Sequence, residues 1–98
     1  MRKEDLIRIE KFCSHHNIEV SFINSLHECG LIEITVIGQE TFICTDHLPQ
    51  IEKMMRLYYD MGVNFEGIET ITHLLQKVSD MQQEIIVLKN KLQLHLSQ

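Results

Sequence analysis

A chain of 98 residues has room for one domain with a modest hydrophobic core. Its net charge of -5 disfavours nucleic acids and anionic membranes as partners, because both attract positively charged proteins. Three cysteines without a Cys-x-x-Cys pair argue against a disulfide framework. The apolar runs are too short for a secretory signal or a membrane span. We therefore expect a soluble cytoplasmic protein.

The N-terminal part of the chain predicts a short helix that ends in a turn. A weakly alternating stretch at residues 4–9 fits either a short strand or the lead-in to a helix. A helix is expected over residues 9–16, and Asn17 marks the turn that follows it. Three apolar residues share one face of this helix: Ile9, Phe12 and Cys13.

A second short helix is expected over residues 20–29. Gly30 is well placed to end it, because glycine readily adopts the left-handed conformation that closes many helices. Its apolar face consists of Phe22, Ile23 and Leu26. Two short helices separated by a turn indicate a helix-turn-helix arrangement.

The next segment predicts a β-hairpin. Residues 31–37 are rich in β-branched side chains, which favour a strand. Gly38 and Gln39 match a two-residue hairpin turn, and the partner strand is expected over residues 40–45. Two short strands directly after two short helices suggest the wing of a winged helix-turn-helix.

A third helix is expected from an Asp46 N-cap to about Met61, and Pro49 is tolerated in its first turn. Gly62 stops it, and Asn64 can cap a fourth helix. The apolar stripe of the third helix comprises Leu48, Ile51, Met54, Met55 and Tyr58.

Two adjacent pairs on the third helix, Met54-Met55 and Tyr58-Tyr59, are candidates for an interaction surface. One member of each pair should face the core and leave its neighbour partly outward. Exposed Met and Tyr are common at interfaces. The same pattern is expected if these side chains pack in the core and only the polar ends of the tyrosines reach water. Both interpretations stay open at this point.

The C-terminal residues predict a coiled-coil helix, and the pattern alone does not decide whether its partner is a second copy of the chain or this domain's own surface. Ile71, Val78, Ile85 and Leu92 repeat every seven residues. The positions three residues later hold Leu74, Met81, Leu88 and, last, the polar His95. We expect a homodimer whose seam includes Leu74, Val78, Met81, Ile85, Leu88 and Leu92. The predicted fold is mainly α, with a winged helix-turn-helix-like domain over 1–75 and a coiled-coil helix over 76–98, which together form one structural unit.

The positions of the charges disfavour DNA binding. No lysine or arginine occurs from Phe12 through Glu52, the part that would contact DNA in a winged helix. Without such residues, nothing holds the segment against an anionic backbone. The same stretch contains six acids: Glu19, Glu28, Glu33, Glu40, Asp46 and Glu52. An acidic surface of this kind fits either a solvated face or the binding of a basic partner.

Cysteine and histidine pairs suggest metal or catalytic chemistry at first sight. Cys13-x-x-His16 and Cys44-x-x-His47 are the two spacings concerned. Zinc sites generally use four converging ligands, and both cysteines fall on apolar faces, where free cysteine behaves as a small hydrophobe. No motif orients a cysteine nucleophile. We therefore expect no metal, no cofactor and no enzymatic activity.

The order and spacing of these elements resemble the CbpM-type chaperone modulators, a branch of the MerR-like helix-turn-helix superfamily. The resemblance covers residues 8 to 96. The matching segments are Glu10-Lys11-Phe12-Cys13, Gly30-Leu31, Gln39-Glu40-Thr41 with Phe42, Asp46-His47, Arg56-Leu57 and Asn64-Phe65-Glu66-Gly67-Ile68.

This resemblance implies a regulator that binds the J-domain of a DnaJ/CbpA-like co-chaperone and inhibits its activity. J-domains present a basic helix, so an acidic surface could bind it, and the candidate contact residues are Glu28, Glu33, Glu40 and Asp46. The alternative is a DNA-binding transcriptional regulator of the MerR type. DNA-binding members usually carry arginine and paired tyrosines in the second helix, where this chain has Asn24, Ser25 and Leu26.

Overall fold

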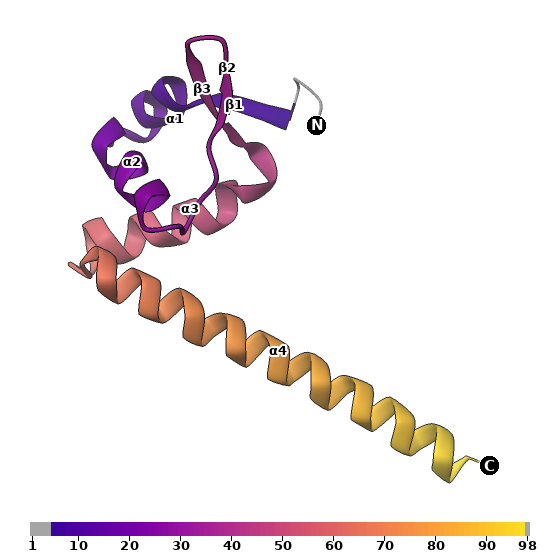
Figure 1. Cartoon of the computed structure of the whole chain (residues 1–98). Coiled ribbons are helices and arrows are strands. Elements are labelled where there is room, and N and C mark those ends of the chain that lie inside the picture. The colour runs from indigo at the N-terminus through magenta and orange to yellow at the C-terminus, as the bar shows by residue number, and fades with distance from the viewer. Residues whose placement is uncertain (1–4, 98) are drawn as a thin grey trace. The chain divides into compact units, whose positions relative to one another are not determined.

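The computed structural model describes residues 5–97. Tertiary contacts divide the chain into two compact units, one up to Ile68 and one from Glu69 onward, a boundary that lies before residue 75. The described residues are mainly helical, with a small three-stranded sheet and a long C-terminal helix, α4 (Phe65–Leu96) (Figure 1). A mainly α fold was predicted and is confirmed.

The sheet has three antiparallel strands rather than the two of the predicted hairpin. Its strands are β1 (Leu6–Arg8), β2 (Thr35–Ile37) and β3 (Glu40–Cys44), in the order β1-β3-β2. Ile7 lies opposite Ile43 in one pair of strands, and Val36 lies opposite Thr41 in the other. Of the two interpretations of residues 4–9, the strand is therefore found in the structure.

The first two helices agree closely with the sequence patterns. They are α1 (Ile9–His16) and α2 (Val20–Glu28). Asn17 and Gly30 follow them in left-handed conformation, with φ of 56° and 76°. After α2, the amides of Gly30 and Leu31 donate to the carbonyls of His27 and Leu26, which is the hydrogen-bond pattern of a Schellman motif.

The strand predicted over residues 31–37 is shortened to its last three residues. The backbone N–H of Leu31 is already used to close α2, and a ring nitrogen of His27 lies 3.3 Å from the carbonyl oxygen of Ile32. These groups are not available for a ladder with β3. The closing motif of the preceding helix therefore limits the strand.

Asp46 does not cap the third helix, so that prediction is wrong. It lies inside a 3-10 turn, Thr45–His47, and α3 (Leu48–Met55) begins after it. An N-cap side chain bonds to the amide two or three residues later. Here the Leu48 N–H already donates to the carbonyl of Thr45, and Pro49 has no N–H to donate.

The third helix also changes form before it ends. Residues Arg56–Asp60 form a π-helical turn, in which the Met61 N–H donates to the Arg56 carbonyl five residues earlier. Gly62, with a φ of 69°, ends the helical run as predicted. The α-helix expected to reach Met61 is thus α-helical only to Met55.

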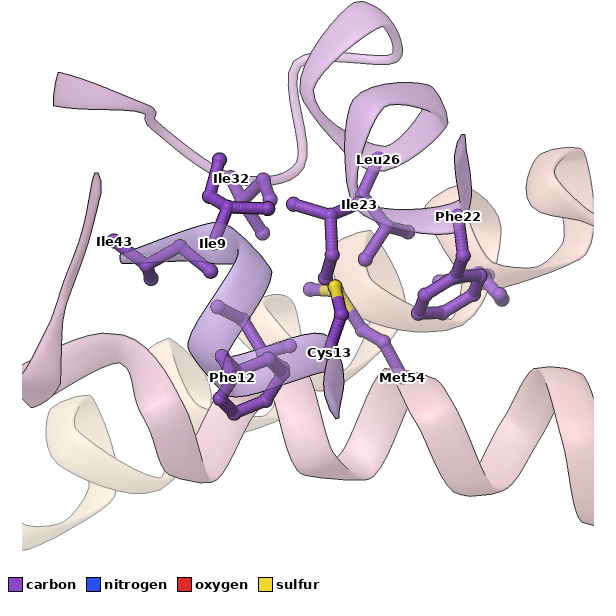
Figure 2. Packing of buried hydrophobic residues seen from close by; sticks show 11 residues of the cluster. Ile9, Phe12, Cys13, Phe22, Ile23, Leu26, Ile32, Ile43 and Met54 are labelled. Atoms are coloured by element: carbon purple, nitrogen blue, oxygen red, sulfur yellow. The ribbon is translucent and has the colours of Figure 1, made fainter. Parts of the chain in front are cut away.

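A single hydrophobic core holds the first unit together. Side chains from α1, α2, α3 and β3 converge on it, as Figure 2 shows for Phe12, Ile23, Ile43 and Met54. Ile68, in the first turn of α4, is also fully buried in this cluster. The complete buried set is Ile9, Phe12, Cys13, Phe22, Ile23, Leu26, Ile32, Ile43, Ile51, Met54 and Ile68.

The start of α4 is fixed by a side-chain cap. The Gly67 N–H donates to Asn64 Oδ1 at 2.8 Å, as expected for an Asn N-cap. A Cβ atom at Gly67 would lie 2.6 Å from Val63 Cγ1 and 3.1 Å from Asn64 Oδ1. Any larger residue at this position would have to displace the Val63 side chain and disturb the Asn64 cap.

Candidate functional site

The four acids predicted to contact a partner are all exposed, and they lie on four different parts of the first unit. Glu28 is the last residue of α2, and Glu33 lies in the connection to β2. Glu40 begins β3, and Asp46 lies in the 3-10 turn before α3. Whether each carboxylate is available to a partner depends on the residues around it.

Two of these acids lie on segments that share a hollow. Glu33 lines a hollow of about 200 Å³ together with His47 and Gln50. The other lining residues come from the connection after α2: Gly30, Leu31 and Ile32. Because His47 directly follows Asp46 in the chain, the α2–β2 connection and the 3-10 turn adjoin here.

Glu40 differs from the other three because it has a basic neighbour. Its Oε1 lies 3.1 Å from Arg8 Nη2, and Glu10 Oε2 lies 3.8 Å from the same nitrogen. All three side chains are half exposed or more, so this contact adds little stability. It does reduce the negative charge at the hairpin, and the spacing of residues in the sequence did not indicate it.

The cysteines lie in different environments. Cys13 and Cys44 are buried, whereas Cys29 is exposed at the end of α2. Burial raises the pKa of the Cys13 thiol above its ordinary value of 9.0, which keeps it neutral. Between residues 5 and 97 no three His, Cys, Asp or Glu side chains converge as metal ligands would.

A cluster of four aromatic rings forms the floor and walls of another hollow, of about 270 Å³. Phe22 is only 3% exposed, and its ring centroid lies 5.0 Å from that of Tyr58 and 5.1 Å from that of Tyr59. The Phe65 ring stacks on Tyr58 at 4.8 Å. The remaining lining residues are polar: Glu19, Ser21 and Ser25. We name this feature the aromatic hollow.

Tyr59 forms the exposed wall of the aromatic hollow, with 47% of its surface accessible. Partial burial raises its pKa above 10.0, the backbone amide of Glu19 opposes that shift, and the Glu19 carboxylate adds to it. The phenol is therefore neutral at physiological pH and lies close to Glu19. Tyr58 is the more buried of the two neighbours, as expected for a pair with one member facing the core.

A larger hollow, of about 420 Å³, is also lined by Tyr59. It is lined by acidic Glu52 and Asp60 and also by basic Arg56. Its mixed charge selects no class of ligand. The other lining residues are His16, Asn17, Ile18 and Met55.

The second unit consists of helix whose predicted seam carries exposed apolar side chains. The six residues predicted to form the dimer seam are each between 48% and 61% exposed. They are Leu74, Val78, Met81, Ile85, Leu88 and Leu92. No helix of residues 5–97 combines the length and apolar character that crossing a membrane requires.

The family model described as "MerR HTH family regulatory protein" matches residues 7–90. Two relatives from Escherichia coli, of O1:K1 / APEC and of O9:H4 strain HS, are both named Chaperone modulatory protein CbpM. Each is 25% identical over 85 residues, which cover 86% of this chain and 84% of the relative. No solved structure gives a significant match. Since the family model spans most of its length, the chain belongs to the MerR HTH family of regulatory proteins, in the branch of the CbpM-type chaperone modulators.

Proposed function

We propose that this protein is a chaperone modulator that binds the J-domain of a DnaJ/CbpA-like co-chaperone and inhibits its activity. It acts by binding rather than by catalysis. The observation that carries the proposal is the similarity to the CbpM proteins along nearly the whole chain. The winged helix-turn-helix-like first unit supplies the binding surface, and its chemistry suits a protein partner better than DNA.

Charge supports this proposal. The stretch without lysine or arginine, Phe12 to Glu52, runs through α2, the hairpin and the start of α3. Glu28, Glu33 and Asp46 project from it into solvent, and none of them forms an ion pair with a described residue. A basic helix of the partner meets complementary charge here, which speeds encounter and selects the partner.

The second unit supports self-association. A helix of this length with an uncovered apolar seam is stabilised mainly by packing against another surface. Its a and d positions follow heptad spacing, with β-branched residues at three of the four a positions, which favours pairing of two helices. A second copy of the chain therefore covers the seam in the proposed homodimer.

The test is association of the purified protein with a J-domain from a CbpA-type co-chaperone, followed by stopped-flow fluorescence at low salt. We expect the combined change Glu28→Lys, Glu33→Lys and Asp46→Lys to slow association by about tenfold or more. The combined change Glu69→Lys, Asp80→Lys and Glu84→Lys, all on α4, alters the net charge equally and is the control for net charge alone. Equal rates for the wild type and the triple variant would remove these acids from the binding face.

The family description keeps transcriptional regulation as the second candidate. The two functions differ in how strongly the binding affinity depends on salt concentration. Binding to DNA would weaken steeply as salt rises, because phosphate contacts release counterions. Retention of DNA at low salt, without binding to any J-domain, would favour the regulator.

A further inference from the structure

The aromatic hollow combines two features that together recognise a cation. Four aromatic residues line it, and Glu19 adds a carboxylate. Aromatic faces attract a positive charge through their quadrupole, and a carboxylate attracts it directly. We propose that the aromatic hollow binds an arginine side chain of the protein partner, stacked on Tyr59 and paired with Glu19.

The carboxylate of Glu19 is available for such a pair. The residue precedes α2 but makes no side-chain hydrogen bond to the helix amides. Its Oε2 accepts a hydrogen bond from the neighbouring Ser21 hydroxyl at 3.1 Å. Across residues 5–97, no lysine or arginine lies within ion-pair distance of it. Glu19 therefore holds an uncompensated negative charge at the edge of an aromatic surface.

Several contacts hold the rings in place before any ligand binds. Phe22 is fixed in the core, and the Tyr58 and Tyr59 rings meet edge to face at 5.0 Å. Phe65 closes the far side, with its centroid 5.8 Å from that of Phe22. A ligand that enters such a packed site loses little affinity to reordering of the protein.

The size and shape of the hollow select arginine. A volume of about 270 Å³ is below the range of sites for drug-sized ligands and suits one long side chain. A guanidinium is flat, so it stacks on the exposed Tyr59 ring while its edge donates hydrogen bonds to the Glu19 carboxylate. The ammonium of a lysine has no flat face to stack.

This contact lies outside the four acids predicted to bind the partner. In the sequence, Glu19 was only one of the six acids in the stretch without lysine or arginine. The hollow gives the chain a specific anchor in addition to general attraction by charge. The identity of the partner as a J-domain rests on the proposed function, but the arginine site itself does not.

The first experiment uses Nα-acetyl-arginine amide as the probe and follows the aromatic ring resonances of the full chain by NMR at constant ionic strength. We expect the Tyr59 ring signals to shift with the arginine probe but not with Nα-acetyl-citrulline amide, which has a similar shape and no charge. Glu19→Gln should reduce the shift, whereas the control Glu10→Gln should not. Absence of the shift, an equal shift with citrulline, or its persistence in Glu19→Gln overturns the site.

The second experiment measures affinity for the J-domain. Tyr59→Ala should weaken binding by roughly 3- to 30-fold, and Tyr59→Phe, which keeps the ring, should not. Tyr59 is half exposed, and a thermal melt verifies that both variants are folded. Unchanged affinity in Tyr59→Ala refutes the J-domain as the source of the arginine and leaves the proposed function standing. A wild-type chain that binds no J-domain refutes the proposed function, while the NMR shifts still decide the site.

Discussion

Replacing Gly67 with alanine is expected to destabilise the protein, although alanine is the better helix former by about 1 kcal/mol. The new Cβ would lie 2.6 Å from Val63 Cγ1, closer than carbon atoms can approach. Overpacking of this kind costs roughly 1–3 kcal/mol. The shift also disturbs the 2.8 Å cap from Asn64, and loss of a cap costs about 0.5–2 kcal/mol. The net effect is a loss of about 2 kcal/mol, or a melting temperature lower by roughly 8–16 °C.

Denaturation by urea at one fixed protein concentration measures this loss, since dimerisation makes stability depend on concentration. A double-mutant cycle with Val63→Ala isolates the cause. Without the Val63 methyl groups, Gly67→Ala should change stability by less than about 1 kcal/mol in either direction. If Gly67→Ala stabilises the native background, or costs the same with and without Val63, the close approach is not what requires glycine.

Two further predictions concern the dimer seam and the thiols. Ile85→Asp should reduce the mass found by light scattering from that of a dimer to that of one 11.5 kDa chain. The control Val87→Asp, at a similarly exposed position off the seam, should leave a dimer. A dimeric Ile85→Asp variant would contradict the predicted seam. Iodoacetamide should modify Cys29 well before Cys13 or Cys44, as mass spectrometry of timed samples would show, and equal rates would contradict their burial. The raised pKa of Cys13 means that the folded protein keeps the thiol proton to a higher pH than the unfolded chain does. The free energy of unfolding should therefore fall as the pH rises above 9.0, and no change with pH there would contradict this shift.

Local signals explain why α1 and α2 were predicted almost to the residue. Apolar spacing defines their buried faces, and Asn17 and Gly30 supply the left-handed residues that end them. The same local reasoning was wrong where neighbouring motifs compete. Closure of α2 used the backbone of residues 31–32, and the 3-10 turn used the amide that Asp46 needed.

The candidate site was only partly visible in the sequence. Tyr58 and Tyr59 stood out as a pair, and Glu19 was one of six acids in the stretch without lysine or arginine. Phe65 follows in another helix, and no periodicity within one segment predicts that these residues meet. The contact between Arg8 and Glu40 has the same origin, since β1 and β3 are brought together only by the sheet.

Because of the π-helical turn, the aromatic hollow depends on the number of residues in the third helical segment. In an α-helix, neighbouring side chains point about 100° apart, so one face rarely receives both. The wider turn at Arg56–Asp60 allows Tyr58 and Tyr59 both to contact Phe22. A relative that lacks one residue between Met54 and Gly62 would have no π-helical turn. Both tyrosines would still align with those of this chain, but only one of them would reach the hollow. Transfer of the arginine site between family members therefore requires a matching residue count here as well as matching residues.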